Sequence, residues 1–118
     1  MSNIRTGTIS GVNGTDPVTL TKQSAAKAYV RMVGSGTVSI TESLNHSSVV
    51  DNAVGQYTLN LSSSMSTSTY AVQSHDNNYG GGWSDSLSVS SYNSRSRSEA
   101  NAYIDTPKFW GLIHGDLA

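Results

Sequence analysis

Apolar and polar residues alternate with a period of two along several short stretches of this chain. The clearest case is the pentapeptide YTLNL, in which Tyr57, Leu59 and Leu61 take every second position. Successive side chains of a β-strand point to opposite faces, so these three residues share one face. We expect that face to pack against a core, while the polar residues between them meet water or a partner chain.

The same alternation, broken by turn-forming residues, predicts further short strands. They fall at residues 4–9, 18–21, 29–33, 37–41, 49–50, 70–72, 87–90, 102–105 and 109–114. Gly34 and Gly36 suit the hairpin connection between the third and fourth of these strands. A Thr-Pro step at Thr106 separates the last two strands. Only residues 21–29 favour a helix, of two turns at most.

Two polar stretches interrupt the pattern. We expect residues 62–69 to cross between strands with Met65 turned inward, and residues 91–101 to form a turn or a sheet edge. Roughly seven or eight short strands at a spacing of about ten residues are typical of an antiparallel sandwich. The predicted fold is therefore all-β, an antiparallel β-sandwich or jelly-roll-like domain over residues 28–118. Residues 1–27 would form a short amino-terminal segment for attachment or trimer packing.

The most irregular segment is HDNNYGGGWSD, residues 75–85, which we expect to form a loop. Its two aromatic residues offer flat apolar faces on which a sugar ring can stack, and its amides and carboxylates can bind sugar hydroxyls. The alternative is that Trp83 fills the core or a subunit interface while the glycines only turn the chain. The candidate glycan-binding residues are Asn77, Asn78, Tyr79, Trp83 and Asp85, with Asp76 as a further polar partner.

Composition adds an expectation of self-association. The 118 residues are only 36% hydrophobic and include 22 serines and 11 threonines. Such a chain buries little apolar surface against the conformational entropy of folding, and without cysteine it has no disulfide to help. Contact between subunits is the remaining large source of burial.

Charge and hydropathy argue against two classes of partner, nucleic acid and membrane. Charged residues make up 13% of the chain and the net charge is −1, so the basic footprint of a nucleic-acid-binding protein is missing. No apolar run approaches the roughly 18 residues of a membrane span, so we expect no membrane insertion. Residues 1–7 lack the apolar core of a signal peptide, and we expect no export by that route.

About half of the chain, residues 19–72 and the last six, resembles a family of small bacteriophage virion proteins that are commonly labelled tail fibre or phage structural proteins and are frequent in marine phages. The resemblance lies in a Lys-Ala-aromatic strand, a Gly-x-Gly hairpin, a Ser-x-Asn segment, a valine pair, an Asp-Asn-x-x-Gly turn, a Tyr-Thr-x-Asn strand and the ending IHGDLA. The matching residues are Lys27, Ala28, Tyr29, Gly34, Gly36, Ser43, Asn45, Val49, Val50, Asp51, Asn52, Gly55, Tyr57, Thr58 and Asn60. The family implies a β-rich, homotrimeric virion component at the end of an appendage, with other virion proteins as partners. It implies no catalytic residues.

Catalytic chemistry finds little support in the sequence. No Gly-x-Ser-x-Gly elbow marks a serine nucleophile, although serines are abundant. Glycan cleavage needs two carboxylates at a defined separation. Glu42, Glu99 and the six aspartates are scattered, mostly beside turn residues. We therefore expect no enzyme and no cofactor.

Metal binding and anion binding each have one weak candidate. His114 and Asp116 alternate on a terminal strand and could converge around a trimer axis as a metal site, but a plain terminal strand explains them as well. His75 and Asp76, adjacent in the sequence, are a weaker candidate for metal binding. Arg95 and Arg97 would share one face of an extended segment and could contact anionic polysaccharide or a neighbouring subunit. A solvated edge that discourages stray strand pairing is the alternative.

These observations lead to one functional expectation and two rivals. The expectation is a non-enzymatic bacteriophage virion structural protein, made in the host cytoplasm and located in the virion. It would be a tail fibre or tail appendage subunit that contributes to attachment to host surface polysaccharide. The rivals are a capsid decoration protein and, less favoured, a glycan-cleaving enzyme.

Overall fold

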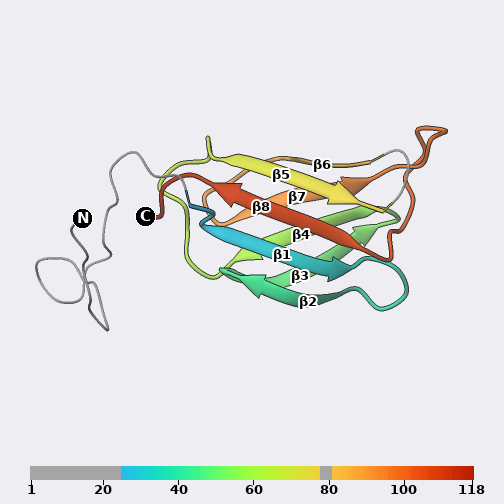
Figure 1. The fold of residues 1–118 in the computed structure, drawn as a ribbon, viewed down its shortest axis with the longest axis horizontal. Coiled ribbons are helices and arrows are strands. Elements are labelled where there is room, and N and C mark those ends of the chain that lie inside the picture. Colours follow the sequence, from blue (N-terminus) through green and yellow to red (C-terminus); the bar gives the residue numbers. More distant parts are fainter. Residues whose placement is uncertain (1–24, 78–80) are drawn as a thin grey trace, which may run out of the picture.

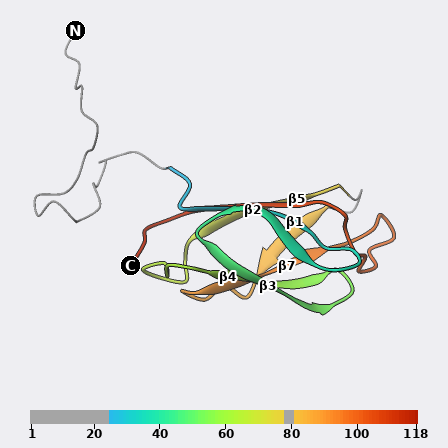
Figure 2. The same cartoon turned by 90° about the horizontal axis from the view of Figure 1, so that it is seen from below.

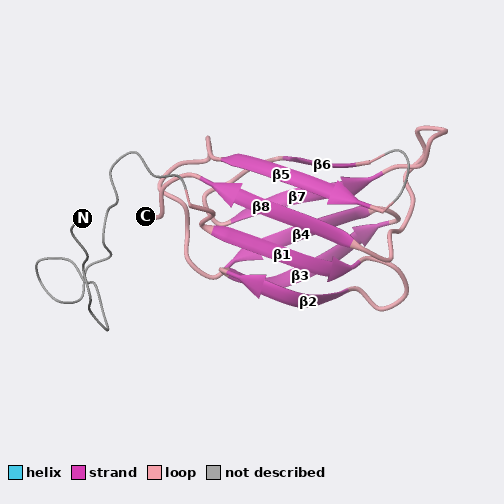
Figure 3. Ribbon diagram, in the orientation of Figure 1, coloured by secondary structure: helices cyan, strands magenta, loops and turns pink. Residues whose placement is uncertain are grey.

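In a computed structural model, the structure describes residues 25–77 and 81–118 (Figure 1). Every regular element in this part of the chain is a β-strand (Figure 3). The strands are β1 (Ala28–Val33), β2 (Ser39–Leu44), β3 (His46–Ala53), β4 (Gln56–Leu61), β5 (Ala71–Asp76), β6 (Gly82–Asp85), β7 (Ser91–Ser96) and β8 (Phe109–His114). The all-β prediction is confirmed.

The strands form two four-stranded antiparallel sheets that pack face to face, as the edge-on view of Figure 2 shows. We call the sheet of order β2-β1-β8-β5 the front sheet, and the sheet of order β3-β4-β7-β6 the back sheet. Three tight hairpins stay within one sheet, namely β1–β2, β3–β4 and β6–β7. The first turns at Gly36, whose φ of +66° suits glycine. The other connections cross between the sheets and close the sandwich.

Alternation along the strands builds the core. In β4, Tyr57, Leu59 and Leu61 are buried, as their spacing predicts. Met65 is also buried, which confirms its inward turn. The hydroxyl of Tyr57 donates a 2.6 Å hydrogen bond to the carbonyl oxygen of Gly34, so this buried polar group has a partner. The buried apolar residues are Ala28, Val30, Met32, Tyr57, Leu59, Leu61, Met65, Tyr70, Tyr92, Phe109 and Ile113.

The interior becomes polar between β5, β6 and β7. Ser94 and Ser96 of β7 are completely buried. The Oγ of Ser84 lies 3.1 Å from that of Ser94 and also hydrogen-bonds to Ser74, which belongs to the opposite sheet. A chain of hydroxyl groups from Ser94 through Ser84 to Ser74 therefore joins the two sheets where apolar side chains are lacking, because a hydroxyl can both donate and accept.

Four sequence predictions are wrong in the described residues. No helix forms at residues 25–29, because inward alternation along β1 outweighs a weak helical propensity. Residues 91–96 are neither turn nor edge but the inner strand β7, since the buried hydroxyl of Ser94 finds a partner in Ser84 of the neighbouring strand β6. Residues 87–90 form a bend rather than a strand, held by hydrogen bonds to Ser88. The strand expected at 102–105 reduces to a single bridge between Tyr103 and Arg97.

The loop predicted at residues 75–85 is also shorter than expected. His75 and Asp76 end β5, and β6 begins at Gly82, so only residues 77–81 connect the two strands. The glycine run hid β6, because glycine is depleted in strands. The strands expected at 4–9 and 18–21 lie outside the described residues, as does the amino-terminal segment up to residue 24.

The two ends of the sandwich carry different parts of the chain. The start of β1 and the C-terminus lie at one end in Figure 1. The β1–β2 connection and a narrow hairpin formed by residues 97–103 lie at the other, which we call the distal end. β5 ends there and β8 begins there, so their register partners His75 and Trp110 lie near the distal end of the front sheet.

Candidate functional site

Trp83 lies on the outer face of the back sheet, close to the distal end. It pairs with Arg95 across β6 and β7, and its side chain is half-buried rather than part of the core. The ring stacks on Tyr103, with centroids 6.2 Å apart and planes inclined by 26°. The guanidinium of Arg97 lies 4.6 Å from the centroid of each ring. Trp83, Asp85, Arg95, Arg97 and Tyr103 together form what we call the arginine–aromatic cluster.

The polar groups of this cluster are bonded to one another. Arg97 donates to the side-chain oxygen of Asn101 at 2.6 Å and to the hydroxyl of Tyr103 at 3.1 Å. That hydrogen bond, with the positive charge behind it, lowers the pKa of Tyr103 below its ordinary value of 10.0. Arg95 forms an ion pair with Asp85 at 2.7 Å. The two arginines do share one face, as predicted, and both have intramolecular partners.

Two of the predicted glycan-binding residues make similar internal contacts. The side-chain oxygen of Asn77 accepts a 2.9 Å hydrogen bond from the hydroxyl of Thr106, and Asp85 holds Arg95. Asn78 and Tyr79 lie outside the described residues. Trp83 and Asp85 therefore come together on β6, but through contacts that stabilise the hairpin of residues 97–103. Glycan binding by the 75–85 segment stays a prediction.

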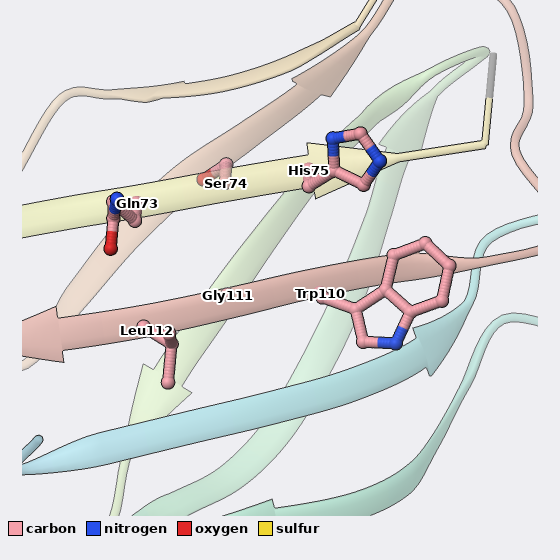
Figure 4. Close-up of a pocket in the computed structure, with 6 residues that line it drawn as sticks. All are labelled: Gln73, Ser74, His75, Trp110, Gly111 and Leu112. Atoms are coloured by element: carbon pink, nitrogen blue, oxygen red, sulfur yellow. The ribbon is translucent and has the colours of Figure 1, made fainter.

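A different aromatic side chain faces a hollow on the opposite side of the molecule. Trp110 of β8 and His75 of β5 are register partners on the outer face of the front sheet, with ring centroids 5.7 Å apart and planes inclined by 29°. Figure 4 shows both rings standing beside each other above the two strands. The hollow encloses about 350 Å³, near the lower end for small-ligand sites. Its lining residues are Gln73, Ser74, His75, Trp110, Gly111 and Leu112.

The register of the front sheet places a line of functional groups across this face. Arg31 of β1, Trp110 of β8 and His75 of β5 stand opposite one another. One step along, Leu112 is the register partner of Gln73 and is 41% exposed. The face thus combines flat or apolar surface with an amide, an imidazole and a guanidinium, all carried by strands rather than by loops. Sites on regular elements hold their groups more precisely than sites on loops.

The sequence contains a signal for this face, namely large apolar residues at both inward and outward positions of β8. In the segment FWGLIH, Phe109 and Ile113 take the inward positions, but Trp110 and Leu112 occupy the outward ones. A strand with apolar residues at both parities presents a large apolar group to its outer side. Trp110 is half-exposed there, whereas Asp76 beside His75 points inward and is buried.

The metal candidate lies at the end of β8. His114 is half-buried on β8 and Asp116 is exposed beyond it. In residues 25–77 and 81–118, no three histidine, cysteine, aspartate or glutamate side chains gather to hold an ion. A site shared between subunits around an axis stays a prediction. None of the described segments forms a helix long and apolar enough to cross a membrane.

Comparison with models of protein families, with curated proteins and with solved structures finds no match to this chain.

Proposed function

We propose that this protein is a non-enzymatic structural subunit of a bacteriophage virion, most simply of a tail fibre or tail appendage, that attaches to polysaccharide on the host surface. The virion assignment rests on the sequence resemblance. The attachment role rests on one observation, the hollow beside Trp110 and His75 on the outer face of the front sheet.

The chemistry of the hollow suits a sugar. The half-exposed ring of Trp110 offers an apolar face to the C–H surface of a pyranose, while Gln73 and His75 supply hydrogen-bonding groups beside it. Tryptophan with a few polar partners is a usual composition for a binding site that must fix the orientation of its ligand.

The position of the hollow suits attachment. Its lining residues His75 and Trp110 are each one residue from the distal end of their strand, β5 and β8 respectively. A subunit joined to its particle at the other end would present Trp110 to the host. In a homotrimer, several weak sites acting together would raise the apparent affinity by roughly 10²–10⁴. Serine and threonine on the remaining surface would keep close-packed copies soluble without charge repulsion.

The first experiment measures binding of the fluorescently labelled protein to host cells. We expect binding to untreated cells and its loss after periodate oxidation, which destroys vicinal diols of sugars. Binding that survives periodate would contradict a polysaccharide receptor that carries free vicinal diols. Release of reducing ends from the bound polysaccharide would instead indicate the glycan-cleaving rival.

The second experiment places the protein on the particle. Immunogold electron microscopy with antibody against the recombinant protein should label the tail or its fibres. Label spread over the head would favour the capsid decoration protein, whose front-sheet hollow would then serve contacts with shell proteins.

A further inference from the structure

Basic side chains surround the hollow of the front sheet. Arg31 is the register partner of Trp110 on one side, and His75 is its register partner on the other. Lys108, two residues before Trp110, is exposed where the chain enters β8. The chain as a whole carries a net charge of −1, so this grouping is local and does not reflect a generally basic protein.

Few carboxylates oppose these charges. Glu42 is the register partner of Arg31 on β2 and accepts a 3.2 Å hydrogen bond from the hydroxyl of Tyr29. Asp76 follows His75 but is buried on the inner side of β5. On the strands of the front sheet, Glu42 is therefore the one exposed carboxylate. Asp105 is exposed three residues before Lys108, and its carboxylate accepts hydrogen bonds from the amide of Gly55 and the hydroxyl of Tyr57.

Arg31 on the front sheet differs in its partners from Arg95 and Arg97 on the back sheet. Arg95 is bound to Asp85, and Arg97 is bound to Asn101 and to two aromatic rings. Within the part of the chain that the structure describes, no ion pair or side-chain hydrogen bond engages Arg31. A guanidinium with free donors matches a carboxylate or sulfate group, to which it can donate two parallel hydrogen bonds.

We propose that the hollow binds an acidic polysaccharide, a chain of sugars that carry carboxylate or sulfate groups. One sugar ring stacks on Trp110, and its anionic substituent, or that of the next sugar, lies against the guanidinium of Arg31. Lys108 adds long-range attraction. This inference deepens the proposed function and rests on it, because it names the class of glycan that the same hollow takes.

Isothermal titration calorimetry with defined oligosaccharides tests the ligand class. The probes are oligogalacturonate for carboxylate, an oligosaccharide of κ-carrageenan for sulfate, and an isomaltose oligomer as the neutral sugar. We expect at least one acidic probe to bind about tenfold more tightly than the neutral one, which a single charge-assisted hydrogen bond can supply. The stronger acidic probe tells carboxylate from sulfate. Equal affinity for the neutral sugar would overturn the inference and leave the proposed function standing, whereas no binding of any glycan would remove both.

Charge-matched variants test the residues. Arg31→Gln should weaken binding of the better acidic probe about tenfold and leave the affinity for the neutral sugar unchanged. Lys27→Gln removes the same charge just before the start of β1, four residues from Arg31 and so about 13 Å away at roughly 3.3 Å per residue. It should change little, because the Debye length at physiological salt is about 8 Å. Equal losses in the two variants would overturn the inference in favour of general charge attraction. The inference would also be overturned if an unrelated polyanion such as oligo-dT bound equally tightly and Trp110→Ala did not affect that binding. Thermal unfolding midpoints within about 2 °C of the wild type would show that each variant is folded.

Discussion

The two tryptophans of this chain lie on opposite outer faces of the sandwich, Trp83 on the edge strand β6 and Trp110 on the inner strand β8, and their surroundings differ. Trp83 on the back sheet lies against Tyr103 under the guanidinium of Arg97. Trp110 on the front sheet stacks on His75 and borders a hollow. Both side chains are half-exposed. Exposure alone therefore does not distinguish a structural tryptophan from a candidate binding residue.

The difference lies in the polar neighbours. Around Trp83, each arginine has an acceptor or a ring within the protein, so a ligand would have to displace those contacts. Around Trp110, the amide of Gln73 and the guanidinium of Arg31 are exposed. A ligand gains most where it meets groups that the protein leaves available, because no internal bond is lost on binding.

The largest expected effect comes from removing the ring on the open face. Trp110→Ala should lower the affinity for the bound glycan about thirtyfold or more, as for a tryptophan at the centre of a binding site. The free energy of unfolding should change by less than about 1 kcal/mol, because the ring adds little to the core. Calorimetry and urea unfolding measure the two quantities. A large loss of stability with unchanged affinity would reverse the roles assigned to the two faces.

The matched substitution on the back sheet, Trp83→Ala, should lower stability and leave glycan affinity almost unchanged. Trp83→Ala removes a stacked aromatic pair and a cation–π contact, so we expect a loss of about 1–2 kcal/mol of stability. Glycan affinity should stay within about twofold of the wild type. If Trp83→Ala instead abolished binding while the protein kept its unfolding midpoint, the glycan site predicted at residues 75–85 would be the correct one.

A smaller effect should follow from replacing the planar guanidinium of Arg97 by an ammonium group of the same charge. Arg97→Lys retains one positive charge over the rings but cannot donate to Asn101 and Tyr103 in the same planar arrangement. We expect a loss of about 0.5–1 kcal/mol of stability, measured by urea unfolding. Arg31→Lys on the open face is the control and should leave stability unchanged, since no ion pair or side-chain hydrogen bond engages Arg31 in residues 25–77 and 81–118.

The smallest effect is a shift in the titration of one tyrosine. Arg97 stabilises the phenolate of Tyr103, so its pKa lies below 10.0, whereas burial raises the pKa of Tyr57 to about 12. On raising the pH, absorbance at about 295 nm should first report Tyr103, and Arg97→Gln should delay this step. Because the folded state releases this proton before the unfolded chain does, the contribution of Tyr103 to stability rises with pH up to 10.0. An early step that survives in Tyr103→Phe would show that another tyrosine causes it.

Prediction from the sequence succeeded where hydrophobic alternation was strong. β8 has the bounds expected from the pattern, β4 differs by one residue, and the hairpin at Gly36 forms as predicted. It failed for β7, whose inward residues include Ser94 and Ser96. Serines can line the inside of a strand only if other segments supply hydrogen-bond partners, and those partners come from β5 and β6.

The candidate binding residues could likewise be named from the sequence only in part. Trp83 and Asp85 could be named from the sequence, because they stand in a segment rich in glycine and polar residues. The hollow could not, since its lining comes from residues 73–75 and 110–112, and Arg31 joins it from a third strand.

The sequence by itself determined an all-β chain with one apolar side to most of its strands, because a period of two in hydrophobicity is a local property. Only the tertiary structure decided which outward residues meet. The pairing of β8 with both β1 and β5 brings Arg31, Trp110 and His75 into one line, and the pairing of β6 with β7 sets Trp83 beside the arginines. Strand register is fixed by contacts between distant segments, so the identity of the open face is a property of the folded sandwich.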